Sequence, residues 1–439
     1  MARREIALAI LYAALAAVDP IEAVKRFVSL EDSSLRAGPR SYDLRRCQHI
    51  IVVGAGKASA AMAQGLEEVL GDRIAAGLVN VKYGHSAPTR IVAVQEAGHP
   101  IPDENGLLGA QRIRQMVDGA GGDDLVICLL SGGGSALLAL PAPEVTLEDK
   151  QGLTELLLRC GATINEINAV RKHLSCLKGG NLARLACPAQ VVSLVLSDVV
   201  GSPLDVIASG PTVPDPSTFG DAWQVLERYG LTSTAPASVV KRLSRGRQGL
   251  IPDTPKPGDP AFARVQNLII GSSETAAAAA EKKAQELGFN TLLLSTYVEG
   301  EAREVARVLA GLAKEVYFHH RPLARPACLI ASGETTVTVK GDGLGGRNQE
   351  LALAAAIALE GLVDVTVLSA ATDGSDGPTD AAGAIVDGST VERARARGLN
   401  PADHLARNDS YRFFQALEEQ LVIGPTRTNV NDLYLALIF

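Results

Sequence analysis

Several apolar runs in the sequence end in glycine and lead into segments whose apolar residues recur with helical spacing. Continuous apolar runs are typical of strands buried on both faces of a parallel sheet, and the helical segments between them supply the crossover connections. The sequence therefore predicts an α/β fold built from repeated strand, turn and helix units. The clearest units are HIIVVGAGKASAAMA at 49–63, DLVICLLSGGGSALLAL at 124–140, QVVSLVLSDVVGSP at 190–203 and QNLIIGSSETAAAAAE at 266–281.

The length of the chain and one proline-rich stretch predict two domains. A chain of 439 residues is longer than one ordinary core requires. Residues 241–263 contain four prolines and show no hydrophobic period, as expected of a linker. We therefore expect a Rossmann-like N-terminal domain at 1–240, with a doubly wound, mainly parallel sheet, and a second α/β domain at 264–439. Because TTVTVK at 335–340 alternates polar and β-branched residues, the second domain is expected to have an antiparallel edge strand and thus a mixed sheet.

Charge and cysteine content limit the partners and the compartment. The formal net charge of −7 argues against binding to nucleic acid or to an anionic membrane surface. The six cysteines form no C-x-x-C pair and several lie in apolar runs, which indicates reduced thiols in a cytoplasmic protein. Residues 1–18 resemble a short signal peptide, but Asp19 and Pro20 interrupt the run, so we expect two consecutive helices there. No uninterrupted apolar segment reaches the ~20 residues of a membrane-spanning helix.

Two glycine-rich turns follow predicted strands and are candidates for binding an anion. In open α/β sheets, ligands bind where the carboxyl ends of strands meet helix N-termini. Glycines let a phosphate or carboxylate approach the backbone amides, and serine hydroxyls add donors. A tight turn that needs only close packing would show the same glycines, and a lysine at a helix start is often merely solvated. The first turn contains Gly54, Gly56 and Lys57, and the second contains Ser131, Gly132, Gly133, Gly134 and Ser135.

A third glycine-rich segment, GDGLGGR at 341–347, matches G-x-G-x-x-G and places Arg347 at the start of a predicted helix. A guanidinium beside exposed helix amides suits phosphate oxygens. A dinucleotide site would also need an acidic residue at the end of the next strand, whereas Asp364 begins that strand. GAGKAS at 54–59 has serine in place of the third glycine and does not fit the phosphate-loop pattern. NAD binding is therefore disfavoured.

Three aspartates follow apolar runs and are candidate metal ligands. Asp198 directly follows VVSLVL, and Asp373 and Asp376 lie in ATDGSDG just after VTVLSA. Mg²⁺ usually binds through one or two carboxylates plus nucleotide oxygens, so these residues favour phosphoryl transfer. An exposed acidic turn is the simpler alternative.

The segment 168–185 is basic and contains Arg171, Lys172 and Lys178. These side chains could neutralise a phosphate or a substrate carboxylate, although a basic run is most often a solvated face. The histidines show no zinc-ligand spacing, and no G-x-S-x-G motif is present, so zinc chemistry and serine hydrolysis are disfavoured.

Seven segments in chain order carry a likeness to one family: GAGKAS, LLSGGGSALL, INAVRKHLSCLKGGNLA, LSDVVGSPLDVIASGPTVPDPSTF, CLIASGETTVTVKGDGLGGRNQELALA, SAATDGSDGPTDAAGAIVDG and TNVNDLYLALI. Together they resemble the class II glycerate kinases, which have a C-terminal MOFRL domain and were once labelled hydroxypyruvate reductases. The likeness runs from about residue 5 to the C-terminus. Long motifs such as GSPLDVIASGPTVPDP and GGRNQE are far more specific than a glycine triplet.

The resemblance implies an ATP- and Mg²⁺-dependent kinase that phosphorylates D-glycerate, usually at the 2-hydroxyl, in a cleft between two α/β domains. It places the family's catalytic lysine, aspartate and arginine on Lys57, Asp198 and Arg347. Asp198 is expected to deprotonate or orient the attacking hydroxyl, with a possible share in Mg²⁺ binding. Further contacts to substrate or nucleotide are expected from Ser209, Gly210, Glu334, Gly345, Gly346 and Asn348.

Two other functions stay open on the sequence alone. One is an NAD(P)H-dependent hydroxypyruvate reductase, which shares the small hydroxy-acid substrate but fits the glycine patterns badly. The other is a non-enzymatic nucleotide- or anion-sensing protein, since doubly wound sheets serve many functions. Also open are whether the product is 2- or 3-phosphoglycerate, which loop binds glycerate and which binds ATP, and whether the chain forms a homo-oligomer.

Overall fold

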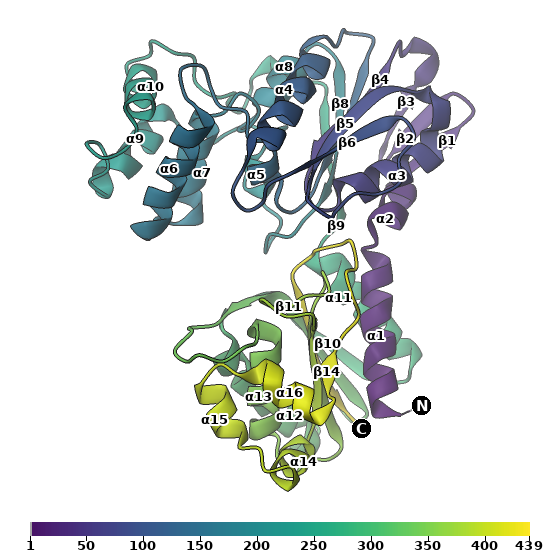
Figure 1. Cartoon of the computed structure of the whole chain (residues 1–439). Coiled ribbons are helices and arrows are strands. Elements are labelled where there is room, and N and C mark those ends of the chain that lie inside the picture. The colour runs from purple at the N-terminus through teal and green to yellow at the C-terminus, as the bar shows by residue number, and fades with distance from the viewer. Residues whose placement is uncertain (1) are drawn as a thin grey trace. The chain divides into compact units, whose positions relative to one another are not determined.

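The computed structural model describes residues 2–439 and divides into two compact units (Figure 1). The large unit comprises Pro20–Ile270, and the small unit comprises the residues up to Asp19 together with Gly271–Phe439. The large unit is therefore inserted into the sequence of the small unit. These bounds differ from the predicted domains at 1–240 and 264–439 at both ends of the large unit.

Two local features account for this difference. Helix α1 (Arg3–Ala17) packs against α11 (Ser273–Glu286), and its Ile10 and Leu11 are completely buried there. The proline-rich stretch 241–263 is not a linker, because it runs from within α10 (Ala237–Arg247) through the short helix η4 (Pro260–Phe262) to β9 (Val265–Gly271), a strand of the large sheet. The Asp215 amide donates a hydrogen bond to the Pro255 carbonyl, 2.9 Å away, which ties this stretch to the large unit.

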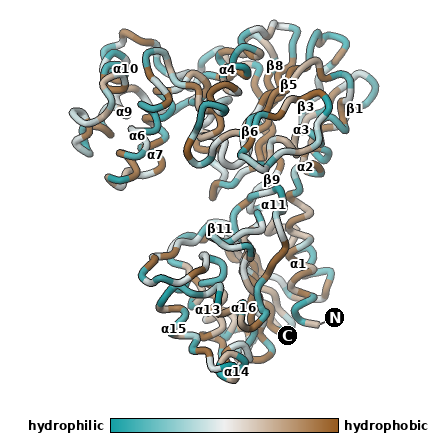
Figure 2. The backbone as a smooth tube through the Cα atoms, viewed as in Figure 1, coloured by the Kyte–Doolittle hydropathy of each residue, from teal (hydrophilic) through white to brown (hydrophobic). Residues whose placement is uncertain are grey.

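The large unit contains a six-stranded sheet in the order β6-β5-β4-β7-β8-β9. The four pairings from β6 to β8 are all parallel, as the apolar runs predicted. All six residues of β7 are buried, because helices cover both faces. Figure 2 shows runs of hydrophobic residues along β5 and β8. The strands are β4 (Ile50–Ala55), β5 (Ile74–Lys82), β6 (Val92–Ala97), β7 (Leu125–Leu130), β8 (Gln190–Leu196) and β9 (Val265–Gly271).

Helix α3 covers one face of this sheet, and α4 with α8 covers the other (Figure 1). Helices α6, α7, α9 and α10 form a helical cluster with its own apolar core, and Thr146, Thr163 and Thr218 cap the first three of them. A three-stranded antiparallel sheet, β1-β2-β3, completes the unit. The helices are α2 (Pro20–Phe27), α3 (Ser59–Leu70), α4 (Glu104–Asp118), α5 (Gly134–Leu137), α6 (Leu147–Arg159), α7 (Ile164–His173), α8 (Asn181–Ala186), α9 (Phe219–Arg228), α10 (Ala237–Arg247) and η4 (Pro260–Phe262), and the strands are β1 (Val28–Glu31), β2 (Ser34–Ala37) and β3 (Arg40–Asp43).

The small unit contains a second six-stranded sheet in the order β10-β11-β15-β12-β13-β14. Only β10 and β11 pair in parallel, so the sheet is mixed, as predicted. The prediction of an antiparallel edge strand at 335–340 is wrong. Thr335 and Thr336 are the last residues of the internal strand β11, and the residues that follow form no regular structure. The strands are β10 (Asn290–Glu301), β11 (Ala327–Thr336), β12 (Val365–Ala371), β13 (Gly383–Asp387), β14 (Gln420–Leu421) and β15 (Asp432–Ile438), and the further helices are α12 (Ala302–His319), α13 (Arg347–Ala358), α14 (Thr390–Ala396), α15 (Pro401–Ala406) and α16 (Ser410–Leu417).

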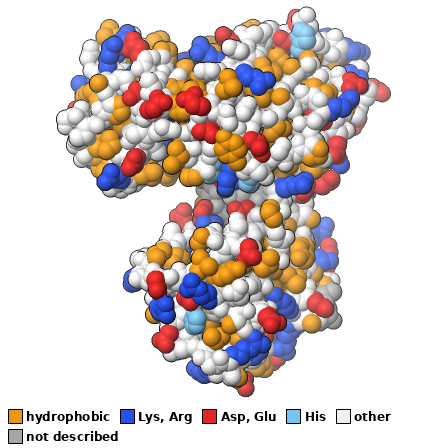
Figure 3. Space-filling view, viewed as in Figure 1, with side chains coloured by type: hydrophobic (Ala, Val, Ile, Leu, Met, Phe, Trp, Pro, Cys, Tyr) orange, Lys and Arg blue, Asp and Glu red, His pale blue; other side chains and the backbone are white. Residues whose placement is uncertain are grey.

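The cysteines, the surface charges and the apolar helices can each be compared with what the sequence predicts. All six cysteines are free. Acidic and basic side chains are interspersed on the face shown in Figure 3. Within residues 2–439, no single helix has the length and apolar composition needed to cross a membrane, although α1 and α2 taken together across their bend meet that measure.

Candidate functional site

The strand order of the large unit has a switch point between β4 and β7. The chain proceeds from β4 to β5 and β6 on one side and then crosses to β7 on the other side of β4. The loops after β4 and β7 therefore leave the sheet in opposite directions, and ligands of doubly wound sheets bind at such a switch point. The loop after β4 contains Lys57, and the loop after β7 is the turn Ser131–Ser135. The structure thus brings together the two turns that the sequence singled out.

The two loops are joined by backbone contacts that require glycine. The Lys57 amide donates a hydrogen bond to the Gly132 carbonyl at 2.8 Å, and the Ala58 amide donates to the Ser131 hydroxyl at 3.0 Å. A Cβ atom on Gly54 would lie 2.2 Å from the carbonyl oxygen of Leu129, and one on Gly56 would lie 2.1 Å from Oγ of Ser131. Both glycines are therefore needed for close approach of the loops, whatever they bind.

The glycine triplet leaves room for neighbouring protein groups. A Cβ atom on Gly132 would lie 2.1 Å from Oδ2 of Asp198, which follows β8. Gly133 has a φ of 82°, and a Cβ atom there would lie 2.9 Å from the His99 ring. A Cβ atom on Gly134 would lie 2.8 Å from that of Ala208. The bare backbone at this strand end therefore allows a carboxylate and an imidazole to lie against the turn.

Lys57 and Lys82 bring positive charge close to His99 at this edge of the sheet. Lys57 is half-buried and has no carboxylate within ion-pair distance among residues 2–439. Burial and the positive charges of Lys57 and Lys82 lower the pKa of the His99 imidazole to about 4. His99 is therefore neutral at pH 7 and can accept or donate a hydrogen bond. His99 was not predicted as a site residue, because it follows β6 without any motif.

The structure separates the three basic residues of 168–185. Lys172 is almost fully buried and pairs with Asp215 at 3.2 Å and with Asp205 at 3.5 Å, so its charge is neutralised within the protein. Arg171 and Lys178 have no acidic partner within ion-pair distance among residues 2–439. None of the three belongs to a solvated face, which was the simpler interpretation of the run.

Ser209 and Gly210 lie between the glycine turn 131–135 and the basic segment 168–185. The Gly179 and Gly180 amides donate hydrogen bonds to the carbonyls of Ser209 and Gly210, at 2.9 and 2.7 Å. The Ser209 hydroxyl lies 2.8 Å from that of Ser135. These two predicted binding residues are thus fixed to the turn and to the basic segment by the protein's own contacts.

In the small unit, carboxylates hold Arg347 at the first position of α13. Its Nε and Nη2 donate to the two oxygens of Asp432, at 2.6 and 3.0 Å, and Nη1 donates to Oε1 of Glu334 at 2.8 Å. Asp432 is completely buried, and the Tyr434 hydroxyl donates to it at 3.1 Å. Burial alone would lower the pKa of Arg347, but Asp432 and Glu334 outweigh it and raise the pKa above its ordinary value. The Arg347 side chain is 31 % exposed, so it can also contact a ligand.

Asp376, Asn348 and the glycines before Arg347 have structural roles. Asp376 is buried, and its two oxygens accept hydrogen bonds from the amides of Asn348 at 3.0 Å and Gln349 at 2.9 Å. Asn348 is completely buried, and its side-chain oxygen accepts a hydrogen bond from Ser369. A Cβ atom on Gly346 would lie 2.3 Å from Cγ of Asp376. Close packing at the start of α13 accounts for these residues without a ligand.

The other glycines of the 341–346 loop are also packed against protein. Cβ atoms on Gly341 and Gly343 would lie 2.3 and 2.5 Å from the Arg407 carbonyl oxygen, and one on Gly345 would lie 2.2 Å from Oγ of Ser410. The G-x-G-x-x-G match in this loop therefore reflects loop packing.

Few carboxylates are available for a metal. Asp373 is half-buried at the end of β12, and one of its oxygens accepts a hydrogen bond from the Ser375 amide at 3.1 Å. Within residues 2–439, no three His, Cys, Asp or Glu side chains lie close enough to hold a metal ion by themselves.

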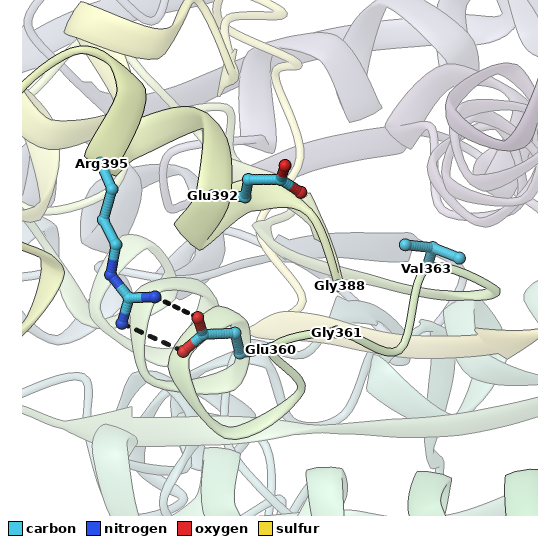
Figure 4. A pocket seen from close by; sticks show the side chains of 6 residues that line it. All are labelled: Glu360, Gly361, Val363, Gly388, Glu392 and Arg395. Carbon is cyan, nitrogen blue, oxygen red and sulfur yellow. Dashed lines mark hydrogen bonds and ion pairs between the residues drawn. The ribbon is translucent and has the colours of Figure 1, made fainter.

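A cavity of about 240 Å³ lies at the other end of the small sheet (Figure 4). Its lining includes Glu360, Val363 and Gly388, which precede β12 or follow the antiparallel β13, whereas Arg347 lies near the opposite strand ends. In this cavity Arg395 forms an ion pair with Glu360. None of the predicted site residues lines it.

Comparison with known proteins agrees with this geometry. The chain matches a family model described as a domain of unknown function, DUF4147, over residues 6–244 and the MOFRL family model over residues 327–432. It is 50 % identical to the D-glycerate 2-kinase of Thermotoga maritima over 390 residues, which is 89 % of this chain and 90 % of that protein. It is 42 % identical to a protein of Agrobacterium vitis named putative hydroxypyruvate reductase, covering 99 % of this chain and 94 % of that one.

A crystal structure of glycerate kinase from Thermotoga maritima matches the fold with a TM-score of 0.89 and 46 % identity, covering 99 % of each chain. Sequence and fold therefore agree along nearly the whole chain. The chain belongs to the glycerate kinases of the MOFRL family.

Proposed function

We propose that this protein transfers the terminal phosphoryl group of ATP to the 2-hydroxyl of D-glycerate in a reaction that requires Mg²⁺. The observation that carries the proposal is the Asp198 carboxylate, which lies against Gly132, the residue whose carbonyl accepts a hydrogen bond from the Lys57 amide. A base and a cation at one switch point match the two needs of an acceptor hydroxyl and a transferring phosphoryl group. The relative named D-glycerate 2-kinase supports the 2-hydroxyl as the acceptor.

In the large unit, Asp198 accepts the proton of the attacking hydroxyl or orients that hydroxyl. Lys57 neutralises charge on the transferring phosphoryl oxygens, because its ammonium has no internal carboxylate to compete with them. The neutral His99 beside Gly133 is available as a hydrogen-bond partner for a substrate oxygen.

In the small unit, Arg347 binds phosphate oxygens of the nucleotide. Its two carboxylate partners fix the guanidinium plane and keep it charged at every relevant pH. Substitution of Arg347 is therefore expected to lower activity, as is substitution of Lys57.

Asp198 and Asp373 are the carboxylates that suit a bound Mg²⁺, which would neutralise phosphate charge and align the nucleotide. Asp376 is not proposed as a ligand, because both of its oxygens accept hydrogen bonds from the start of α13.

The test is an assay of the purified protein with D-glycerate, ATP and Mg²⁺ that follows ADP release. Coupling to enolase, which consumes 2-phosphoglycerate directly, distinguishes the 2-phosphate from the 3-phosphate. A parallel reaction with hydroxypyruvate and NADH or NADPH measures reductase activity. ADP release that depends on glycerate and gives an immediate enolase signal supports the proposal. Oxidation of the reduced cofactor without ADP release would overturn it in favour of a reductase, and binding without turnover would indicate a sensor.

A further inference from the structure

Three basic side chains of the large unit form a cluster without an acidic partner. Lys150 lies on α6, Arg171 lies on α7, and Lys178 lies in the turn before α8. The Lys178 ammonium donates to the carbonyl of Leu138, and that of Lys150 lies 3.5 Å from the adjacent carbonyl of Ala139. We call these three residues the cationic cluster.

The cationic cluster contains positive charge that the protein does not neutralise. Burial and the charges of Lys150 and Arg171 lower the pKa of Lys178 well below its ordinary value, and burial lowers the pKa of Lys150 to about 8. Among residues 2–439, no carboxylate lies within ion-pair distance of the three, whereas the adjacent Lys172 has two. Buried like charges are costly unless an anion joins them. The guanidinium of Arg171 stays charged in any case and makes no hydrogen bond to the described chain.

A chain of polar contacts links the cluster to the glycine turn. Asn168 lies one turn before Arg171 on α7 and accepts a hydrogen bond from the Ser209 hydroxyl at 3.3 Å. The Ser209 hydroxyl lies 2.8 Å from that of Ser135. Ser135 ends the same turn in which Gly132 contacts Asp198. Ala208 and Ser209 both have left-handed φ values, 50° and 59°, a strain of the kind that is found at functional sites.

We propose that Arg171, supported by Lys150 and Lys178, binds the carboxylate of the acid whose hydroxyl is phosphorylated. This inference rests on the proposed function and adds the group that selects the acid over a neutral polyol. The planar guanidinium matches a carboxylate with two parallel hydrogen bonds. In glycerate the carboxylate carbon is bonded to the carbon that carries the 2-hydroxyl, so an anchored carboxylate orients that hydroxyl. Helix α7, which carries Arg171, contacts the turn 131–135 through Asn168 and Ser209, and Gly132 of that turn lies against Asp198.

The test compares D-glycerate with D-glyceramide, in which a neutral amide replaces the carboxylate. For Arg171→Met, we expect kcat/KM for D-glycerate to fall about 100-fold. We expect kcat/KM for D-glyceramide to change less than about 3-fold, and the KM for ATP to change less than about 3-fold. Arg159→Met removes an exposed arginine from the neighbouring α6 and serves as the matched control, with wild-type values for both acceptors.

Equal losses with both acceptors would overturn the inference, and so would a raised KM for ATP with an unchanged KM for D-glycerate, which would assign the cluster to a nucleotide phosphate. If Arg171→Met does not fold, Arg171→Lys is measured instead and is expected to lose about 10-fold with D-glycerate alone. Calorimetric titration of D-glycerate into the wild-type protein and the variant needs no turnover. Weaker binding by the variant would therefore support the carboxylate anchor even if phosphoryl transfer were not found.

Discussion

The two cations that we propose as catalytic, one in each unit, are held in opposite ways. In the small unit, Arg347 is fixed by Asp432 and Glu334, so its charge is compensated and its position is determined before any ligand arrives. In the large unit, no carboxylate of residues 2–439 lies within ion-pair distance of Lys57 or of Arg171, so the protein does not compensate these two charges by ion pairs. One edge therefore fixes the position of its cation in advance, and the other leaves its positive charge available to an anion. Substitutions should therefore affect stability in the first and chiefly turnover in the second.

The largest expected effect is the loss of turnover in Lys57→Met. We expect kcat to fall about 1,000-fold, because a charge that stabilises the transferring phosphoryl group is removed. The free energy of unfolding should change by less than about 0.5 kcal/mol, since Lys57 has no ion pair to lose. Steady-state kinetics and urea unfolding measure the two quantities. Lys25→Met, which removes an exposed lysine on α2, is the control, and a kcat near the wild-type value for Lys57→Met would exclude its proposed role.

Arg347→Met should lose stability as well as turnover. The substitution leaves the buried Asp432 without its ion-pair partner, so we expect the free energy of unfolding to fall by about 3 kcal/mol. The double variant Arg347→Met/Asp432→Asn should recover most of that stability and none of the turnover. Arg395→Met breaks an exposed pair in the same unit and should change stability by less than about 1 kcal/mol. If Arg347→Met kept full stability, the contrast between the two edges would fail.

Substitutions of the two aspartates of ATDGSDG should have different effects, one on stability and the other on the Mg²⁺ requirement. Asp376→Asn removes a hydrogen-bond acceptor from the start of α13 and should lower the unfolding free energy by about 2 kcal/mol, with the Mg²⁺ concentration for half-maximal activity unchanged. Asp373→Asn should raise that Mg²⁺ concentration and leave stability within about 0.5 kcal/mol of the wild type. Thermal unfolding and Mg²⁺ titrations of activity distinguish them. The opposite pattern would assign the metal to Asp376.

The smallest effect is on the pH dependence of stability. Because the pKa of His99 is lowered to about 4 in the folded protein, the unfolded chain takes up a proton at His99 first as the pH falls below about 6.5. The folded state therefore loses stability between about pH 6.5 and 4. Allowing for its partial exposure, we expect His99→Gln to remove about 1 kcal/mol of the loss between pH 7.5 and 5. Urea unfolding at these pH values measures the free energy of unfolding. If it fell by the same amount in the wild type and in His99→Gln, protonation of His99 would not destabilise the folded state.

The strand and turn pattern was predictable from local sequence. The apolar runs predicted the parallel sheet, and the glycines of GAGKAS and SGGGS marked the two loops that meet at the switch point. The mixed second sheet was predicted correctly, although the strand offered as evidence for it ends at Thr336 and lies inside the sheet.

Long-range partners were not predictable, because no local pattern encodes them. Asp432 lies 85 positions after Arg347 and reads in the sequence as the start of an apolar strand. Lys150 lies on an ordinary amphipathic helix, and only the fold places its ammonium beside Lys178. Asp376 was selected as a metal ligand for its position after a strand, but the contact that defines its role comes from Gln349 and Asn348, earlier in the chain.

The interleaving of the two units has a consequence for biosynthesis. The ribosome makes α1 first, but the helix against which it packs, α11, begins only at Ser273. During translation the whole of the large unit emerges while the apolar side chains of Ile10 and Leu11 still lack their final neighbours. Domains generally fold as they emerge, so the large unit is complete before the small unit can close around its own first helix. A nascent chain arrested before residue 271 would thus contain a folded large unit, preceded by the helix α1 with its apolar side chains still exposed.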